Sequence, residues 1–245
     1  MKRRVVAVAL VTAVFVVLSA HLQAQPQALT MKLDGIGSVS APLQIVLVLT
    51  LLSFLPAALV IMTSFTRIVI VLHFLRQAIG SQDMPPNQVL VGLTLFLTAF
   101  IMAPVAERIN DSAVQPVIAG RMSIGEGITA ATPPLREFML KQTRQTDLAL
   151  FVEISKTPRP TTAADLPMLV VVPAYAISEL KTGFQMGFFV FVPFLLIDLV
   201  VSTTLLSMGM LQLPPAMISL PFKLLLFVMV DGWNLIVTSI VRSFA

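Results

Sequence analysis

The fold is decided by a stretch of 23 residues, 184–206, which reads FQMGFFVFVPFLLIDLVVSTTLL and carries one charge, Asp198. A helix rises about 1.5 Å per residue, so this stretch is long enough to cross about 30 Å of hydrocarbon. Three further apolar runs have comparable lengths, at residues 43–62, 89–106 and 217–240. The sequence therefore predicts an all-α fold of membrane-associated helical hairpins.

The composition excludes most soluble classes of protein. The 245 residues are 57% hydrophobic and 11% charged, whereas a soluble domain is about 45–50% apolar and about 25% charged. The mean hydropathy is +0.93. An ordinary soluble globule, a disordered chain and a nucleic-acid-binding protein are thus excluded. The net charge of +4 depends on Lys2, Arg3 and Arg4, because the rest of the chain has 13 basic and 12 acidic residues.

Few side chains are available for chemistry. There is no cysteine, and the two histidines are His21 and His73. Disulfides, thiol catalysis and cysteine-ligated metals are therefore excluded. We predict no catalytic residues, no metal site and no cofactor, so the protein is not expected to be an enzyme.

The N-terminus has the pattern of a secretory signal peptide. Basic residues 2–4 precede an apolar run at 5–18, which is short for a membrane span, and small residues follow it. We expect residues 1–24 to be the signal peptide, with cleavage after Ala24 or, alternatively, after Ala20. An uncleaved anchor helix is the other reading. Residues 25–42 are then an extracytoplasmic segment.

The four long runs pair into two hairpins. The first covers residues 43–106, and its turn is expected over 63–88, where Gly80, Pro85 and Pro86 are turn signals. The second covers 166–245 and turns over 207–216. The 12-residue apolar run at 166–177 is expected to be the start of a buried or interfacial helix. Both turns then face the cytoplasm, and the C-terminus lies outside.

The segment between the hairpins, residues 107–165, differs in composition. It holds seven basic and seven acidic residues, so it is highly charged but neutral. We expect a solvated extracytoplasmic helical insertion. One of its helices is predicted to begin with Thr132 as N-cap and Pro133 at the first position.

Three charges interrupt the second hairpin. Asp198 lies 13 residues before Leu211, the centre of the turn, and Lys223 lies 12 residues after it. On antiparallel helices the two have similar depth, so an ion pair is expected; the alternative is that one of them lines a wet path. Asp231 is expected near the outer end, where it contacts another subunit.

Prolines and glycines indicate that the helices are kinked and shielded. A proline inside a helix removes a backbone hydrogen-bond donor and bends the helix. Such an interruption is tolerated at membrane depth only where protein or water surrounds it. Gly183 and Gly187 form a small-xxx-small step that permits close packing, which we assign to contacts between subunits. We therefore expect most of the chain to be buried against copies of itself or partners. The prolines concerned are Pro56, Pro104, Pro173, Pro193 and Pro221.

The second turn, SMGMLQLPP at 207–215, is apolar where a surface loop would be polar. Methionine is flexible and adapts to varied shapes, and hydrophobic constrictions can gate a channel. Two readings stay open: a constriction built from several such turns, or a loop packed in a core.

Four long motifs resemble a known family. They are PAYAISELKTGFQMG at 173–187, TSFTRIVIVL at 63–72, QDMPPNQVL at 82–90 and LPFKLLLFVMVDGW at 220–233. Together, from residue 43 to the C-terminus, the chain resembles the FliP family of flagellar export proteins and its virulence type III counterparts. The signal peptide favours the flagellar branch.

The resemblance implies a core pore subunit of the type III export gate, in the bacterial inner membrane at the flagellar basal body. It implies a homopentamer that joins FliQ and FliR, with FlhA and FlhB as further components. Unfolded flagellar subunits would pass through its centre. The kinked hairpins would lie partly above the bilayer but contact membrane lipid, with both mature termini and residues 107–165 in the periplasm.

The resemblance also assigns residues to the pore. The family's methionine gasket falls on Met208, Gly209, Met210 and Leu211, where many relatives carry further methionines instead of Leu211 and Gln212. Phenylalanines within 184–191 are candidates for the pore lining. Two other functions remain alternatives: a virulence export gate, and an ion-coupled transporter that uses Asp198, Lys223 and Asp231 as a relay, although no inverted repeat is found.

Overall fold

The computed structural model describes residues 41–80, 85–155, 165–210 and 212–244. The predicted signal peptide, nearly all of the segment 25–42 and Leu211 of the predicted gasket lie outside the described residues. The chain divides into two compact units, Met1–Leu51 and Leu52–Ala245. The described part of the first unit is the beginning of helix α2, and all that follows concerns the second.

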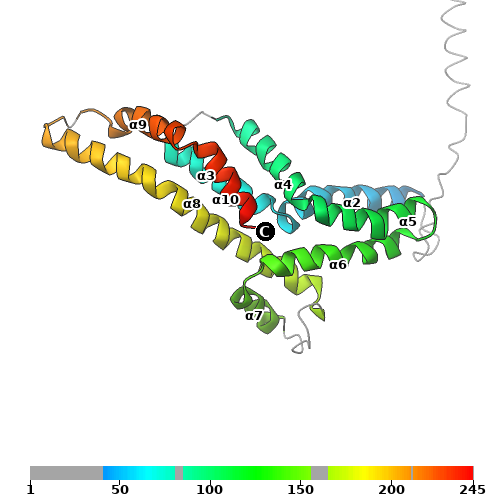
Figure 1. Ribbon diagram of the computed structural model, residues 1–245. Helices are drawn as coiled ribbons and strands as arrows, with labels where there is room; N and C mark the ends of the chain where they lie inside the picture. The colour runs from blue at the N-terminus through cyan, green and yellow to red at the C-terminus, as the bar shows by residue number, and fades with distance from the viewer. Residues whose placement is uncertain (1–40, 81–84, 156–164, 211, 245) are drawn as a thin grey trace, which may run out of the picture. The chain divides into compact units, whose positions relative to one another are not determined.

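Every regular element in the described residues is a helix, so the predicted all-α fold is confirmed (Figure 1). Their bounds are α2 Ala41–Met62, α3 Phe65–Ile79, α4 Asn87–Ile109, η1 Asn110–Val114 (a π-helical turn), α5 Gln115–Ile118, α6 Ile124–Gln142, α7 Gln145–Ile154, α8 Met168–Ser207, α9 Pro215–Met229 and α10 Gly232–Arg242.

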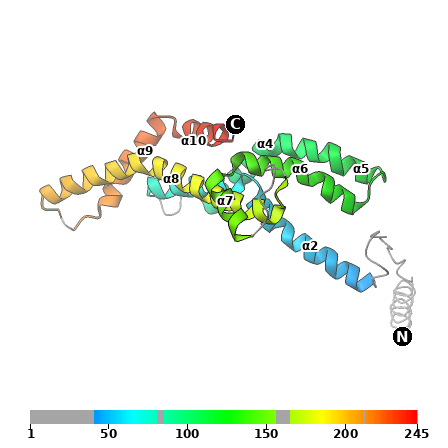
Figure 2. The ribbon, with the colours of Figure 1, turned by 90° about the horizontal axis from the view of Figure 1, so that it is seen from below.

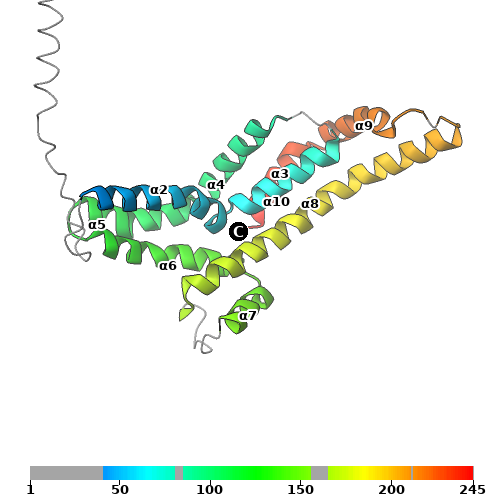
Figure 3. The same cartoon turned by 180° about the vertical axis from the view of Figure 1, so that it is seen from behind.

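Helix α8 is the central helix of the second unit. Its 40 residues rise about 60 Å, and α3 packs along it while α6, α7 and α9 contact other parts of it (Figure 3). The apolar run at 166–177 contains the start of α8, as expected, and its residues Val170, Val171 and Ala174 are buried. It continues without a break into 184–206, because the α-helix persists through Pro173 and Pro193.

Helix α3 occupies most of the segment that was expected to be a turn, residues 63–88. Its apolar residues Ile68, Val71, Leu72 and Leu75 recur at helical spacing and are at most 1% exposed. This stripe packs against α8, so tertiary burial makes a helix of a segment whose flanking glycine and prolines suggested a loop. The helix ends at Gly80, which has the left-handed φ of 84°.

One bend follows the predicted span 43–62, and a second lies within the predicted span 217–240. Helices Pro56–Met62 and Phe65–Ile79 meet at 78°, and Pro215–Met229 and Gly232–Arg242 meet at 64°. Two further stretches, Asn87–Ile118 and Met168–Ser207, are each long and apolar enough to cross a membrane. The described residues thus provide two candidate spans, or up to four if each bent pair counts as one.

The charged insertion is helical, as predicted, but its helices start elsewhere. Helix α6 begins after Ser123. The Ser123 hydroxyl accepts a hydrogen bond from the Glu126 N–H. In return, the Glu126 carboxylate accepts a hydrogen bond from the Ser123 N–H at 2.8 Å. This capping box satisfies two donors of the first turn. The hydrogen bonds that the Glu126 carboxylate accepts from the Ser123 N–H and from the Ser123 hydroxyl lower the pKa of Glu126. Pro133 consequently lies inside α6. Figure 2 shows α6 running back beside α4.

Candidate functional site

The turn that joins α8 to α9 has its methionines on the surface. Met208 is 67% exposed and Met210 is 42% exposed. Between them Gly209 has φ of 74°, and its N–H donates to Leu206 O while the Met210 N–H donates to Leu205 O at 3.0 Å. This is a Schellman motif, which requires a left-handed residue after the helix end. The glycine therefore ends α8 and presents two methionines to the surroundings.

Several aromatic side chains of α8 are largely exposed. Phe184, Phe188 and Phe189 are 54%, 58% and 75% exposed, whereas Phe194 further along is 5% exposed. Three of the four phenylalanines within 184–191, the candidates for a pore lining by resemblance, are thus exposed. In the isolated protomer they form an apolar surface free for contact with other chains or lipid.

Asp198 and Lys223 are brought together. Lys223 Nζ lies 2.6 Å from Asp198 Oδ2 and also donates to Ala78 O, at 2.9 Å, near the end of α3. The other carboxylate oxygen of Asp198, Oδ1, accepts a hydrogen bond from Ser219 Oγ at 2.6 Å. Lys223 is 4% exposed, but the Asp198 side chain is 35% exposed. The pair thus fastens the α8–α9 hairpin to the C-terminal end of α3.

The two glycines predicted to pack between subunits instead face α3 of the same chain. A Cβ at Gly183 would lie 3.2 Å from Ile70, and one at Gly187 would lie 2.6 Å from the Phe74 ring. Both glycines are buried. Their small size is therefore accounted for by the close approach of α3 and α8 inside one protomer.

Gly187→Ala should destabilise the protein by about 1–3 kcal/mol, because the new methyl group overlaps Phe74 Cβ and Cγ, which cannot simply swing away. Gly92→Ala is the matched control. A Cβ at Gly92, inside α4, meets nothing within 4 Å, so alanine should be neutral or stabilising by up to about 1 kcal/mol. Thermal unfolding in detergent measures both. Equal melting temperatures for the two variants would contradict the packing.

Asp231 lies at the bend between α9 and α10. It has φ of 50° and ψ of 54°, the left-handed region that residues with a Cβ rarely adopt. Its carboxylate accepts a hydrogen bond from Asn234 Nδ2 at 3.1 Å. The residue is exposed, and its observed role is to shape the turn.

Sequence reasoning missed a second buried ion pair, between Arg67 of α3 and Glu179 of α8. Arg67 is 2% exposed and Glu179 is fully buried. Arg67 Nε donates to Glu179 Oε2 at 2.9 Å, and Nη2 contacts the other oxygen. The pair could have been suspected, because Arg67 immediately precedes the apolar run 68–72 and Glu179 follows the apolar run 166–177. Arg67, however, fell in the segment that was taken for a solvated turn.

The remaining donors of Arg67 hold the C-terminal residues. Nη1 donates to both Ser243 O and Ser243 Oγ at 2.9 Å, and Nη2 donates to Gln142 Oε1 at 3.2 Å. The guanidinium carbon lies 3.8 Å from the centroid of the Phe244 ring. All five N–H groups of the guanidinium thus have acceptors. One side chain joins α3, α6, α8 and the residues after α10.

Helix α7 is held on α8 by a separate polar cluster. Asp147 is 2% exposed; it accepts from Ser178 Oγ at 2.9 Å and is paired with Lys181. The Arg144 N–H donates to the same Ser178 hydroxyl at 3.1 Å. The hydrogen bond from Lys181 holds the pKa of Asp147 below its ordinary value, with Ser178 contributing. The cluster positions the insertion and has no residue in common with the methionine turn.

Comparisons with known proteins agree with the resemblance seen in the sequence. The FliP family model matches residues 48–240. Flagellar biosynthetic protein FliP of Bacillus subtilis (strain 168) is 56% identical over 207 residues, which are 84% of this chain and 94% of that protein. The protein of the same name from Pectobacterium carotovorum is 54% identical over 211 residues, 86% of this chain and 82% of that protein. The protein of the same name from Aquifex aeolicus is 46% identical over 212 residues, which are 86% of this chain and 89% of that protein.

Proposed function

Because the chain belongs to the FliP family, we propose that it is a core pore subunit of the flagellar type III export gate, which passes unfolded flagellar subunits across the inner membrane. One observation supports the proposal beyond family membership: the long α8–α9 hairpin ends in a surface turn on which Met208 and Met210 are exposed, beside a single polar side chain after them, Gln212. A solvated turn would instead be polar, so this turn is suited to contact with other apolar groups.

In the proposed assembly, several copies of the chain supply these apolar groups to one another. A closed ring of chains, a pentamer in the proposed assembly, brings the turns to a common axis, where Met208, Gly209, Met210 and Leu211 form a gasket. Methionine side chains can rearrange around a passing polypeptide and close again afterwards. In the closed ring they keep the constriction dry and block ions.

The partners are those that the resemblance implies, and the exposed apolar surface supports their binding. The large apolar side chains left exposed on α8 and α9, such as Phe189, Leu199 and Met229, are covered by neighbouring copies, by FliQ and FliR, and by lipid. FlhA and FlhB complete the gate. In this assignment the inner membrane holds the complex at the basal body, and α6 and α7 lie with both mature termini on the periplasmic side.

The gasket assignment is tested by measuring whether the closed pore leaks ions. In bacteria that depend on this chain for motility, Met208→Ala with Met210→Ala should make the resting membrane leak small ions, because alanine leaves the constriction wider and easier to wet. Patch-clamp conductance, or uptake of a small dye, measures the leak. Met229→Ala is the control, because Met229 is 76% exposed but lies at the other end of α9. Equal conductance in the unsubstituted strain and both variants would overturn the gasket assignment.

A further inference from the structure

The last helix of the chain, α10, buries Ile236 and Ile240 on its inner face, and its directional contacts lie at its two ends. At its beginning, Asp231 holds the left-handed backbone of the 64° bend, a conformation that costs energy in any residue with a Cβ. At its far end, Ser243 and Phe244 are bound by Arg67. Gln142 Nε2 adds a hydrogen bond to Phe244 O at 3.2 Å. We call these contacts the C-terminal clasp.

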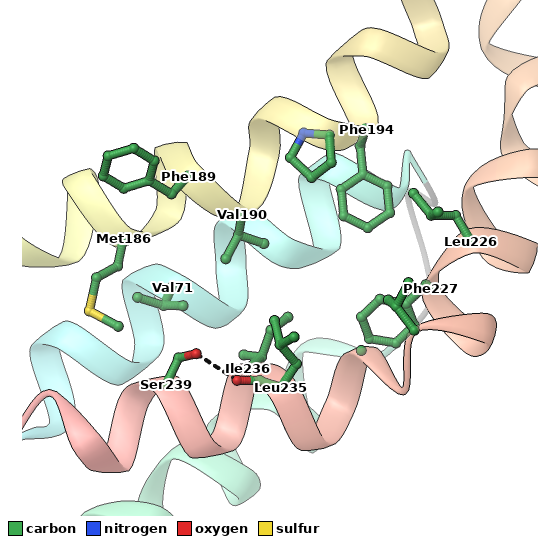
Figure 4. Close-up of a pocket in the computed structure, with 13 residues that line it drawn as sticks. Val71, Met186, Phe189, Val190, Phe194, Leu226, Phe227, Leu235, Ile236 and Ser239 are labelled. Atoms are coloured by element: carbon green, nitrogen blue, oxygen red, sulfur yellow. Dashed lines mark hydrogen bonds between the residues drawn. The ribbon is translucent and has the colours of Figure 1, made fainter.

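Beside the first half of α10 lies an unfilled pocket that is partly open to the surface. This cavity of about 440 Å³ lies between α10 and helices α3, α8 and α9 (Figure 4). Its lining is apolar, with Val71 and Phe194 on one side and Ile236 of α10 on the other. Ser239 is its polar side chain from α10, and its hydroxyl donates to Leu235 O at 2.7 Å. Close packing, the usual source of helix attachment, is therefore incomplete under α10.

We propose that α10 is a hinged strap over this cavity, held closed by the C-terminal clasp and able to swing about the bend at Asp231. The clasp is charge-assisted and directional, so it fixes one position of the strap. The apolar contacts across a partly empty cavity do not, because dispersion attraction falls off quickly when surfaces separate. The bend is the natural hinge, since straightening it returns Asp231 to an ordinary helical conformation.

The chain contains no cysteine, so one introduced thiol reports on one position. Val71→Cys places it under the strap, at a residue that is 1% exposed. The clasp is weakened by Ser243→Ala with Phe244→Ala, which leaves the Arg67–Glu179 pair in place. In the full chain purified in detergent, this change should speed the reaction of the introduced thiol with N-ethylmaleimide about tenfold, because opening becomes more frequent.

A second thiol separates strap opening from unfolding. Val171→Cys is the same substitution at a residue of α8 that is fully buried outside the cavity. Its reaction rate should not change when the clasp is weakened. Equal acceleration at both positions, or no acceleration at either, would overturn the strap. Trp233, the single tryptophan, gives an independent signal: its ring lies 5.4 Å from Phe227 at the hinge, so its emission should shift on opening.

Discussion

Arg67→Met should lower the free energy of unfolding by about 3–5 kcal/mol, the usual cost of removing one partner of a buried ion pair. The substitution leaves Glu179, which is fully buried, without its counter-ion. It also leaves Gln142 Oε1 and Ser243 O without the donors that they have now. Such a loss is a large fraction of the stability of a typical domain, so we expect little folded protein in the membrane.

Two variants make this expectation specific. Arg67→Lys keeps the charge but cannot reproduce five donors in one plane, so it should recover only a minor part of the stability. Arg108→Met removes the exposed Arg108–Glu137 pair, whose side chains are 47% and 70% exposed; its cost should be about 0–1 kcal/mol. Thermal unfolding in detergent and the amount of protein in membranes measure all three. A melting temperature for Arg67→Met equal to that of Arg108→Met would contradict the role of the buried pair.

The parts of the fold that could be predicted from the sequence are those with a local signal. The length of the apolar runs predicted the helices. Because Asp198 and Lys223 lie at similar distances on either side of one turn, they were predicted to lie at a similar depth on antiparallel helices. That argument needs only the helical rise and a tight turn. The methionine turn itself was visible because it is short and bounded by Pro214 and Pro215.

The parts that escaped prediction depend on contacts between distant segments. Arg67 and Glu179 are 112 residues apart, so no spacing rule links them. Helix α3 was taken for a loop because it follows a span and precedes Gly80 and two prolines, yet burial against α8 decides its structure. Gly183 and Gly187 correctly indicated close packing, but a glycine pair cannot say whether the partner helix belongs to the same chain.

Replacing both members of the Asp198–Lys223 pair should damage the protein less than the sum of the single changes. Asp198→Asn leaves the Lys223 ammonium, 4% exposed, with Ala78 O and a neutral amide, and should cost about 3–5 kcal/mol. Lys223→Met should cost less, because Asp198 is partly exposed and keeps its hydrogen bond from Ser219.

The double variant Asp198→Asn with Lys223→Met removes both charges, so the desolvation cost disappears together with the attraction. We expect a loss of about 1–2 kcal/mol and a clear coupling energy in the double-mutant cycle. Measured by melting temperature and by flagellar export in the same strains, a structural pair should regain export as it regains stability. A proton relay would behave differently, since the double variant would be stable but inactive. That outcome would assign Asp198 and Lys223 to ion transfer and would contradict their role as the fastening between the α8–α9 hairpin and α3.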